Sequence, residues 1–250
     1  MTSQANEVMY GVHPVLELLR GGGRPVDKLY LLKGRGGGLL EEIVHLAKAH
    51  GVTLHFEPKS VLDRVASHEK HQGVVALVAA KAYDTPESLI KIAHEKNQPP
   101  LVLLLDGVED PRNLGAIVRT AEAAGVHGII LPRHRSVGLT GTVVKASAGA
   151  LEHLPVARVV NLSRTMEELK GEGLWLVGLE PTAPQLYTEL DYKGPIGVLV
   201  GGEGRGIREG LLRHCDHLVS IPMKGRVESL NVSMAVGILL YEILRQRDRK

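Results

Sequence analysis

The chain has 250 residues, of which 44% are hydrophobic and 23% charged, so it is long enough to bury a core and lacks the composition of a disordered protein. Its formal net charge of +2 gives no global field that by itself indicates a nucleic-acid partner. The single cysteine, Cys215, excludes an internal disulfide, and no apolar run reaches the ~20 residues that cross a bilayer. We therefore expect a cytoplasmic protein without a membrane span.

The first 80 residues alternate helical and extended patterns, which is typical of a compact α/β unit. The patterns predict helices at 13–20, 39–50 and 59–66 and strands at 29–32, 53–56 and 73–80. The chain then becomes polar over residues 81–98, up to a break at Asn97-Gln98-Pro99-Pro100. This organisation predicts an N-terminal domain over 1–80, a linker over 81–98 and a C-terminal domain over 99–250.

Beyond Pro100, short apolar runs alternate with helical patterns. The runs predict strands at 101–105, 128–131, 156–159, 174–179, 196–200 and 218–221. Continuous apolar strands joined by crossover helices predict a mostly parallel sheet with both faces covered. Ligands of such sheets bind beyond the carboxyl ends of the strands, so the loops that follow the strands are the candidate site.

The first of these loops follows the strand at 101–105 and leads into a helix. Asp110 before Pro111 predicts the start of that helix, because the carboxylate caps free amides and proline tolerates the first turn. Arg112 and Arg119 are seven residues apart and project from one helix face. The alternative is a solvated helix in which Arg119 pairs with Glu122.

The second loop, Gly201-Gly202-Glu203-Gly204-Arg205-Gly206-Ile207, follows the strand at 196–200. Its glycines let the backbone approach a ligand closely or adopt a positive φ. The spacing fits neither the dinucleotide fingerprint nor the phosphate loop. Glu203 is placed to accept hydrogen bonds from a ligand or to orient an arginine.

The third loop runs from Ile221 to Ser233 and mixes cations, a carboxylate and small polar side chains between a strand and an apolar helix. The helix predicted at 230–244 is apolar around most of its circumference, so it has to be covered on all sides. We expect a second subunit to supply one cover.

Other features carry less weight. The segment His68-Glu69-Lys70-His71 is one residue short of the His-Glu-x-x-His zinc pattern, so no metal is predicted. Cys215 is interpreted as a structural thiol rather than a nucleophile. Basic residues cluster in four short segments: 33–35, 133–135, 224–226 and 245–250. Each segment on its own is typical of a solvated loop or tail. Together they favour a phosphate-binding surface.

Taken in order, the three loops resemble the motifs of the SpoU/TrmH-type RNA ribose 2′-O-methyltransferases of the SPOUT class. Asn113-Leu114-Gly115 with Arg119-Thr120 resembles motif one, 201–206 motif two, and 221–223 with 229–233 motif three. Residues 9–15 and 71–73 resemble the family's small N-terminal substrate-binding domain, which is similar to ribosomal protein L30e. Within the family, the resemblance is to bacterial enzymes that methylate a guanosine ribose in the peptidyl-transferase loop of 23S rRNA.

The resemblance implies an L30e-like N-terminal α/β domain and a C-terminal α/β domain with a deep trefoil knot, an exception to the rule that chains avoid knots. It also implies S-adenosylmethionine as the cofactor, RNA as the substrate and a homodimer with catalytic sites at its interface. Gly201, Ile221 and Leu230 match the cofactor-binding positions, which act largely through backbone groups. The positions around the reacting centre are matched by Asn113, Arg119, Glu203, Ser229 and Asn231.

The family's mechanism casts Arg119 as the base that activates the ribose hydroxyl. Arginine has a pKa above ~12 and is normally not deprotonated in proteins, so a phosphate clamp or a charge that stabilises the developing alkoxide is the alternative. The alternative substrate is tRNA, and an alternative of another class is a non-catalytic RNA-binding dimer. A nucleotide-dependent metabolic enzyme is disfavoured, because the chain has no phosphate-loop or dinucleotide fingerprint.

Overall fold

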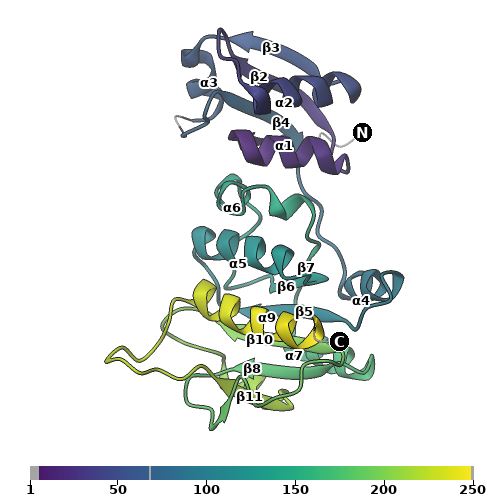
Figure 1. Ribbon diagram of the computed structural model, residues 1–250, viewed down its shortest axis with the longest axis vertical. Helices are drawn as coiled ribbons and strands as arrows, with labels where there is room; N and C mark the ends of the chain where they lie inside the picture. Colours follow the sequence, from purple (N-terminus) through teal and green to yellow (C-terminus); the bar gives the residue numbers. More distant parts are fainter. Residues whose placement is uncertain (1–5, 68, 249–250) are drawn as a thin grey trace. The chain divides into compact units, whose positions relative to one another are not determined.

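The computed structural model describes residues 6–67 and 69–248, which fold into two compact units (Figure 1). The first unit contains the chain up to Ala82 together with Leu139–His153, and the second contains the rest of the described chain. The chain therefore passes between the units three times, after Ala82, after Gly138 and after His153.

The first unit is built on a four-stranded sheet in the order β1 (Asn6–Tyr10), β4 (Val74–Ala79), β2 (Val26–Leu32) and β3 (Thr53–Glu57). β4 is antiparallel to β1 and β2, and β3 runs parallel to β2 at the edge. Its helices are α1 (Val12–Gly21), α2 (Gly38–Ala49) and α3 (Lys59–Val65). The three predicted helices and three predicted strands are all present, whereas the short strand β1 was not predicted.

The segment Leu139–His153 holds α6 (Gly141–Ala146) and the 3-10 turn η1 (Ala150–Glu152), which contact β1 and α1 respectively. A nearly buried ion pair ties it to the first unit, since Nη1 of Arg24 lies 3.0 Å from Oε1 of Glu152 and their side chains are 7% and 5% exposed. The predicted domain boundaries assigned this segment to the C-terminal domain. The structure places its contacts in the first unit, because its partners come from residues far earlier in the chain.

The second unit contains a seven-stranded sheet in which every neighbouring pair is parallel. This confirms the predicted mostly parallel sheet, with one short strand, β9, that was not predicted; the knot implied by the resemblance stays a prediction. The strand order is β7 (Val156–Val159), β6 (Gly128–Pro132), β5 (Leu101–Asp106), β10 (Ile196–Gly201), β8 (Trp175–Leu179), β11 (His217–Ser220) and β9 (Gln185–Leu186).

Helices cover both faces of this sheet (Figure 1). On one face, α4 (Pro86–Glu95), α7 (Leu162–Gly171) and α8 (Glu209–Leu212) pack into one apolar cluster with the strands. On the other face, α5 (Pro111–Ala123) packs against α9 (Val232–Asp248), which also contacts β10. α4 lies inside the segment 81–98 that was predicted to be a linker. Thr85 caps it through a hydrogen bond from Ser88 N (3.3 Å), and its buried apolar face fixes it to the second unit.

A buried histidine fixes the start of the central strand β5. His127 is 2% exposed, its Nδ1 accepts a hydrogen bond from Leu101 N (3.0 Å), and its Nε2 lies 3.0 Å from Oε1 of Gln98. Burial, with the nearby charges of Lys96 and Arg247, lowers the pKa of His127 to about 4. The ring is therefore neutral at physiological pH, as its acceptor role requires.

Candidate active site

The first two candidate loops are joined at the carboxyl edge of the sheet, where β5 and β10 end side by side. Gly201 is paired with Asp106 in the strand register, and Gly202 N donates to the carbonyl oxygen of Asp106 at 2.7 Å. The Asp106 carboxylate is 2% exposed and accepts a hydrogen bond from Nε of Arg208 at 2.9 Å. This ion pair holds the far end of the glycine loop against β5. Sequence reasoning did not single out Asp106, although its place directly after an apolar strand was the available signal.

Two glycines of the second loop are required by the close approach of backbones. A Cβ atom on Gly202 would lie 1.9 Å from the carbonyl oxygen of Gly107, and one on Gly201 would lie 2.0 Å from the carbonyl carbon of Gly206. Neither contact leaves room for a side chain. The backbone that approaches these positions belongs to the protein itself, so the glycines shape the loop as well as exposing it.

A cavity of about 860 Å3 lies at this edge, bounded by the segments that follow β8, β10 and β11. Its volume falls in the ~300–1,000 Å3 range of small-molecule sites. Apolar side chains such as Leu179, Val200 and Ile207 form part of its wall. Six of the eight predicted site residues line it: Gly201, Glu203, Ile221, Ser229, Leu230 and Asn231.

One side-chain amide connects all three loops. Nδ2 of Asn231 donates to Oδ1 of Asn113 at 3.0 Å and to Oε1 of Glu203 at 2.7 Å. On its other side, Oδ1 of Asn231 accepts a hydrogen bond from Ser233 N at 3.0 Å, so Asn231 caps α9. The helix therefore begins at Val232, two residues later than predicted, and Leu230 lies in the loop that lines the cavity.

Arg119 stands apart from this network. It is exposed on α5, six residues beyond Asn113, which corresponds to ~9 Å along the helix axis. In the part of the chain that the structure describes, Arg119 makes no hydrogen bond or ion pair, so the alternative in which it pairs with Glu122 is not observed. The predicted helix start is confirmed, because Oδ1 of Asp110 accepts a hydrogen bond from Arg112 N at 2.7 Å.

The charges around the cavity favour a cationic ligand. The lining of the cavity contains four carboxylates but only one guanidinium, that of Arg205. A site with this surplus of negative charge attracts a positive group by Coulomb interaction. The carboxylates are Glu180, Glu203, Glu209 and Glu228. Glu180 was missed in the sequence, although it directly follows the strand β8, where the carboxyl-end rule applies.

The cysteine is unsuited to nucleophilic chemistry. Burial, with the nearby charge of Asp216, raises the pKa of the Cys215 thiol to about 11. Within residues 6–67 and 69–248, no group of three or more histidine, cysteine or acidic side chains is arranged to hold a metal ion; His68 lies outside them.

None of the helices in the described ranges has the length and apolar character that a membrane span needs.

Two family models match the two parts of this chain. The SpoU rRNA Methylase family matches residues 100–241, and the model for RNA 2′-O ribose methyltransferase substrate binding matches residues 8–84. The chain belongs to the SpoU rRNA methylase family. The resemblance stated from the three loops is thereby confirmed, while the individual role of each site residue stays a prediction.

Curated relatives match the SpoU chain over nearly its full length. The putative TrmH family tRNA/rRNA methyltransferase YacO of Bacillus subtilis is 44% identical over 98% of both chains. The 23S rRNA (guanosine-2′-O-)-methyltransferase RlmB of Shewanella oneidensis is 44% identical over 96% of this chain and 98% of its own. Among solved structures, the SpoU methyltransferase AviRb of Streptomyces viridochromogenes in complex with the cofactor AdoMet has a TM-score of 0.82 at 28% identity, covering 98% of this chain and 91% of AviRb.

Proposed function

We propose that this SpoU-family chain transfers a methyl group from S-adenosylmethionine to the ribose 2′-hydroxyl of a guanosine in 23S rRNA. The observation that carries the proposal is the Asn231 amide, which joins residues of all three family motifs beside one cavity. The names of the RlmB relatives supply the substrate. We further propose a cytoplasmic location, which follows from an rRNA substrate.

The residues of the cavity fit the proposed cofactor. S-adenosylmethionine carries a sulfonium and an ammonium group, which suit a cavity lined by four carboxylates and one arginine. The flat faces of its adenine suit packing against Ile221 and Leu230, and the backbone at Gly201 offers hydrogen-bonding groups to the polar edge of the base. When bound, the cofactor supplies an activated methyl group.

We assign the chain's own contribution to positioning and charge. Asn113, Glu203 and Asn231 form one hydrogen-bonded group that can hold the ribose in line with the methyl donor. The hydroxyl proton leaves to solvent. The charge of Arg119, which is exposed and lies outside this hydrogen-bonded group, then stabilises the developing alkoxide electrostatically; Arg119 does not accept the proton, because a guanidinium keeps its protons. If Arg119→Lys kept near-wild-type turnover with an unshifted pH profile, a role as the base would be excluded; a shifted profile would contradict the assignment as a fixed charge.

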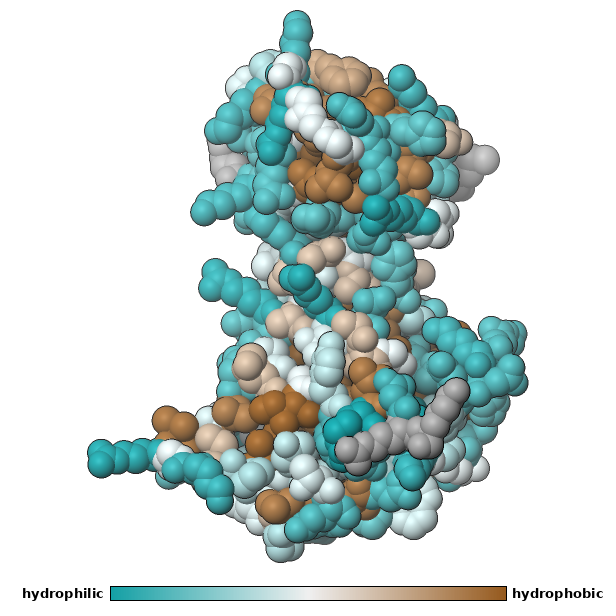
Figure 2. Space-filling model, in the orientation of Figure 1, coloured by the Kyte–Doolittle hydropathy of each residue, from teal (hydrophilic) through white to brown (hydrophobic). Residues whose placement is uncertain are grey.

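We also propose that the chain acts as a homodimer through α9. Met234 and Tyr241 are seven residues apart on this helix and are 61% and 53% exposed. Figure 2 shows hydrophobic side chains gathered over the N-terminal part of α9, where a second copy would cover them. Sedimentation equilibrium tests this, since a monomer at micromolar concentration would exclude it.

The substrate is tested by mapping ribose methylation across rRNA and tRNA in cells with and without the protein. Loss of one guanosine mark in 23S rRNA is the expected result, and loss of a tRNA mark with unchanged rRNA would assign the alternative substrate. Calorimetric titration with S-adenosylmethionine separates both from a non-catalytic RNA-binding dimer, which would not bind the cofactor. Exposed cations at 133–135 and at Lys224 and Arg226 are available for phosphate contacts in either RNA.

A further inference from the structure

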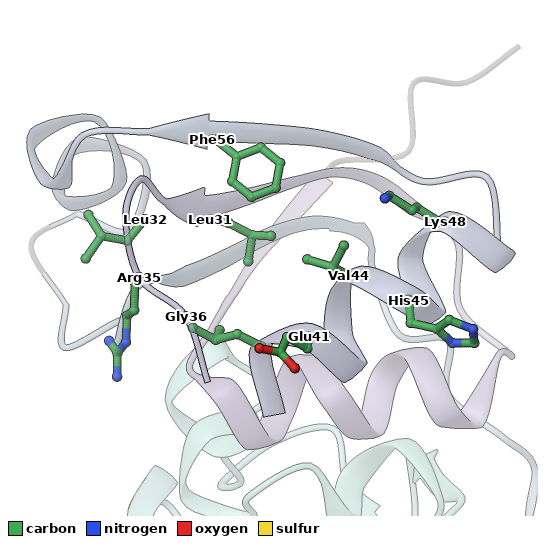
Figure 3. A pocket seen from close by; sticks show the side chains of 10 residues that line it. Leu31, Leu32, Arg35, Gly36, Glu41, Val44, His45, Lys48 and Phe56 are labelled. Atoms are coloured by element: carbon green, nitrogen blue, oxygen red, sulfur yellow. The ribbon is translucent and has the colours of Figure 1, made fainter. Parts of the chain in front are cut away.

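The first unit contains a groove of its own, remote in sequence from the three loops. It has a volume of about 290 Å3 and lies between α2 and the edge strand β3 (Figure 3). Leu31, Leu40 and Val44 form its apolar surface, and Phe56 projects from β3 over it. The volume is at the lower limit of small-molecule sites, so the groove has room for about one ring system.

Phe56 is unusual because the sequence has no other phenylalanine and this one is 57% exposed. Leu31, its partner in the strand register, is only 4% exposed, so the same sheet face is well buried one strand further in. β3 is the last strand of the sheet, and among the described residues no further strand covers the ring. A large aromatic face left open beside aliphatic side chains forms a slot for a flat apolar ligand.

The charges at the rim indicate which flat ligand fits. Arg35 and Lys48 lie at opposite ends of the groove, and Glu41 lies between them on α2 (Figure 3). Arg35 uses one nitrogen to donate to the carbonyl oxygen of Gln72 (2.6 Å), which fixes the side chain and leaves further N–H groups for a ligand. Two cations flanking an aromatic slot match a base with a phosphate on either side, and the Glu41 carboxylate can accept a hydrogen bond from an exocyclic amino group.

We propose that this groove binds one unstacked nucleobase of the RNA substrate, stacked on Phe56, with adjacent phosphates at Arg35 and Lys48; the proposal rests on the proposed function. Sequence-specific recognition of RNA uses bases splayed out of loops and stacked on aromatic side chains. The single stacking position anchors the substrate and leaves the chemistry to the second unit. A peptide partner is disfavoured, because the groove is short and two of its three fully charged side chains are cationic.

The test compares Phe56→Ala with Trp175→Ala, a matched control that removes an aromatic side chain of the same 57% exposure from the second unit. Dissociation constants are measured with the full chain for a 23S rRNA transcript and for a fully paired RNA duplex, which offers no unstacked base. We expect Phe56→Ala to weaken binding of the transcript about tenfold and leave duplex binding unchanged, because a stacked base contributes on this scale. Phe56→Trp should retain binding, and Trp175→Ala should behave as wild type with both RNAs.

Equal binding of the transcript by Phe56→Ala and wild type would overturn the proposal, as would an equal loss with transcript and duplex. If Phe56→Ala instead lost affinity only for the assembled large ribosomal subunit, the groove would belong to a protein partner. Methyl transfer by the wild-type protein to the same transcript is measured alongside. If the wild-type protein methylates the transcript and Phe56→Ala binds it as tightly as wild type, the base-binding role of the groove is refuted and the proposed function stands. If Phe56→Ala weakens binding but the wild-type protein transfers no methyl group, the proposed function is refuted and the base-binding role stands.

Discussion

Replacing Asn231 by Asp separates its two roles. Asp keeps the side-chain oxygen that caps α9, but it loses the N–H groups given to Asn113 and Glu203. A hydrogen bond to a charged acceptor contributes about 1.5–3 kcal/mol, and the lower end applies to this exposed site. The new carboxylate would also face that of Glu203, which adds about 1 kcal/mol of repulsion in a water-like dielectric. The total of about 2–3 kcal/mol predicts a 30- to 150-fold fall in kcat/KM.

The assay is methyl transfer from labelled S-adenosylmethionine to a 23S rRNA transcript, measured from pH 5 to pH 8. Protonation of the newly introduced carboxylate at low pH would remove the repulsion and restore one donor, so the defect of Asn231→Asp should shrink as the pH falls. Asn231→Ala also loses the cap, so its free energy of unfolding should fall by about 1 kcal/mol and it should unfold at a lower temperature. Asn231→Asp keeps the cap and should not lose this stability. A kcat/KM for Asn231→Asp within threefold of wild type, or a defect that is the same at pH 5 and pH 8, would refute the reasoning.

Three further results are expected. Gly202→Ala should weaken binding of S-adenosylmethionine at least tenfold by calorimetry, because its Cβ would lie 1.9 Å from the carbonyl oxygen of Gly107; unchanged affinity would contradict this. Glu152→Ala should lower the free energy of unfolding by about 2–3 kcal/mol in urea melts, because it leaves Arg24 nearly buried without this partner. The pKa of His127 is lowered to about 4, so its contribution to stability is complete above about pH 6.5 and is lost as the pH falls toward 4; His127→Gln should flatten this dependence.

The sequence predicted the elements whose burial is continuous along the chain. Runs such as Leu101–Asp106 are apolar at nearly every position. This pattern is typical of a parallel strand that is covered on both faces. The sheet, and the edge of it that carries the loops, were therefore predictable. The hydrogen bond between Asn113 and Asn231 was predictable only through the family motifs. Local periodicity identifies helices and strands but not contacts between residues more than a hundred positions apart. For the same reason, the ion pair between Arg24 and Glu152 could not be predicted from the sequence. The assignment of segment 139–153 to the first unit could therefore not be predicted either.

The three passages of the chain between the units limit how the protein can be divided. A fragment that began at Tyr83 would keep Leu139–His153 but lose the partners that bury it, and Val143 and Leu151, now fully buried, would meet water. An exposed apolar segment of this kind promotes aggregation rather than independent folding. Gain or loss of the substrate-binding unit would therefore require compensating changes in this internal segment, which keeps its apolar side chains covered only while the first unit is present.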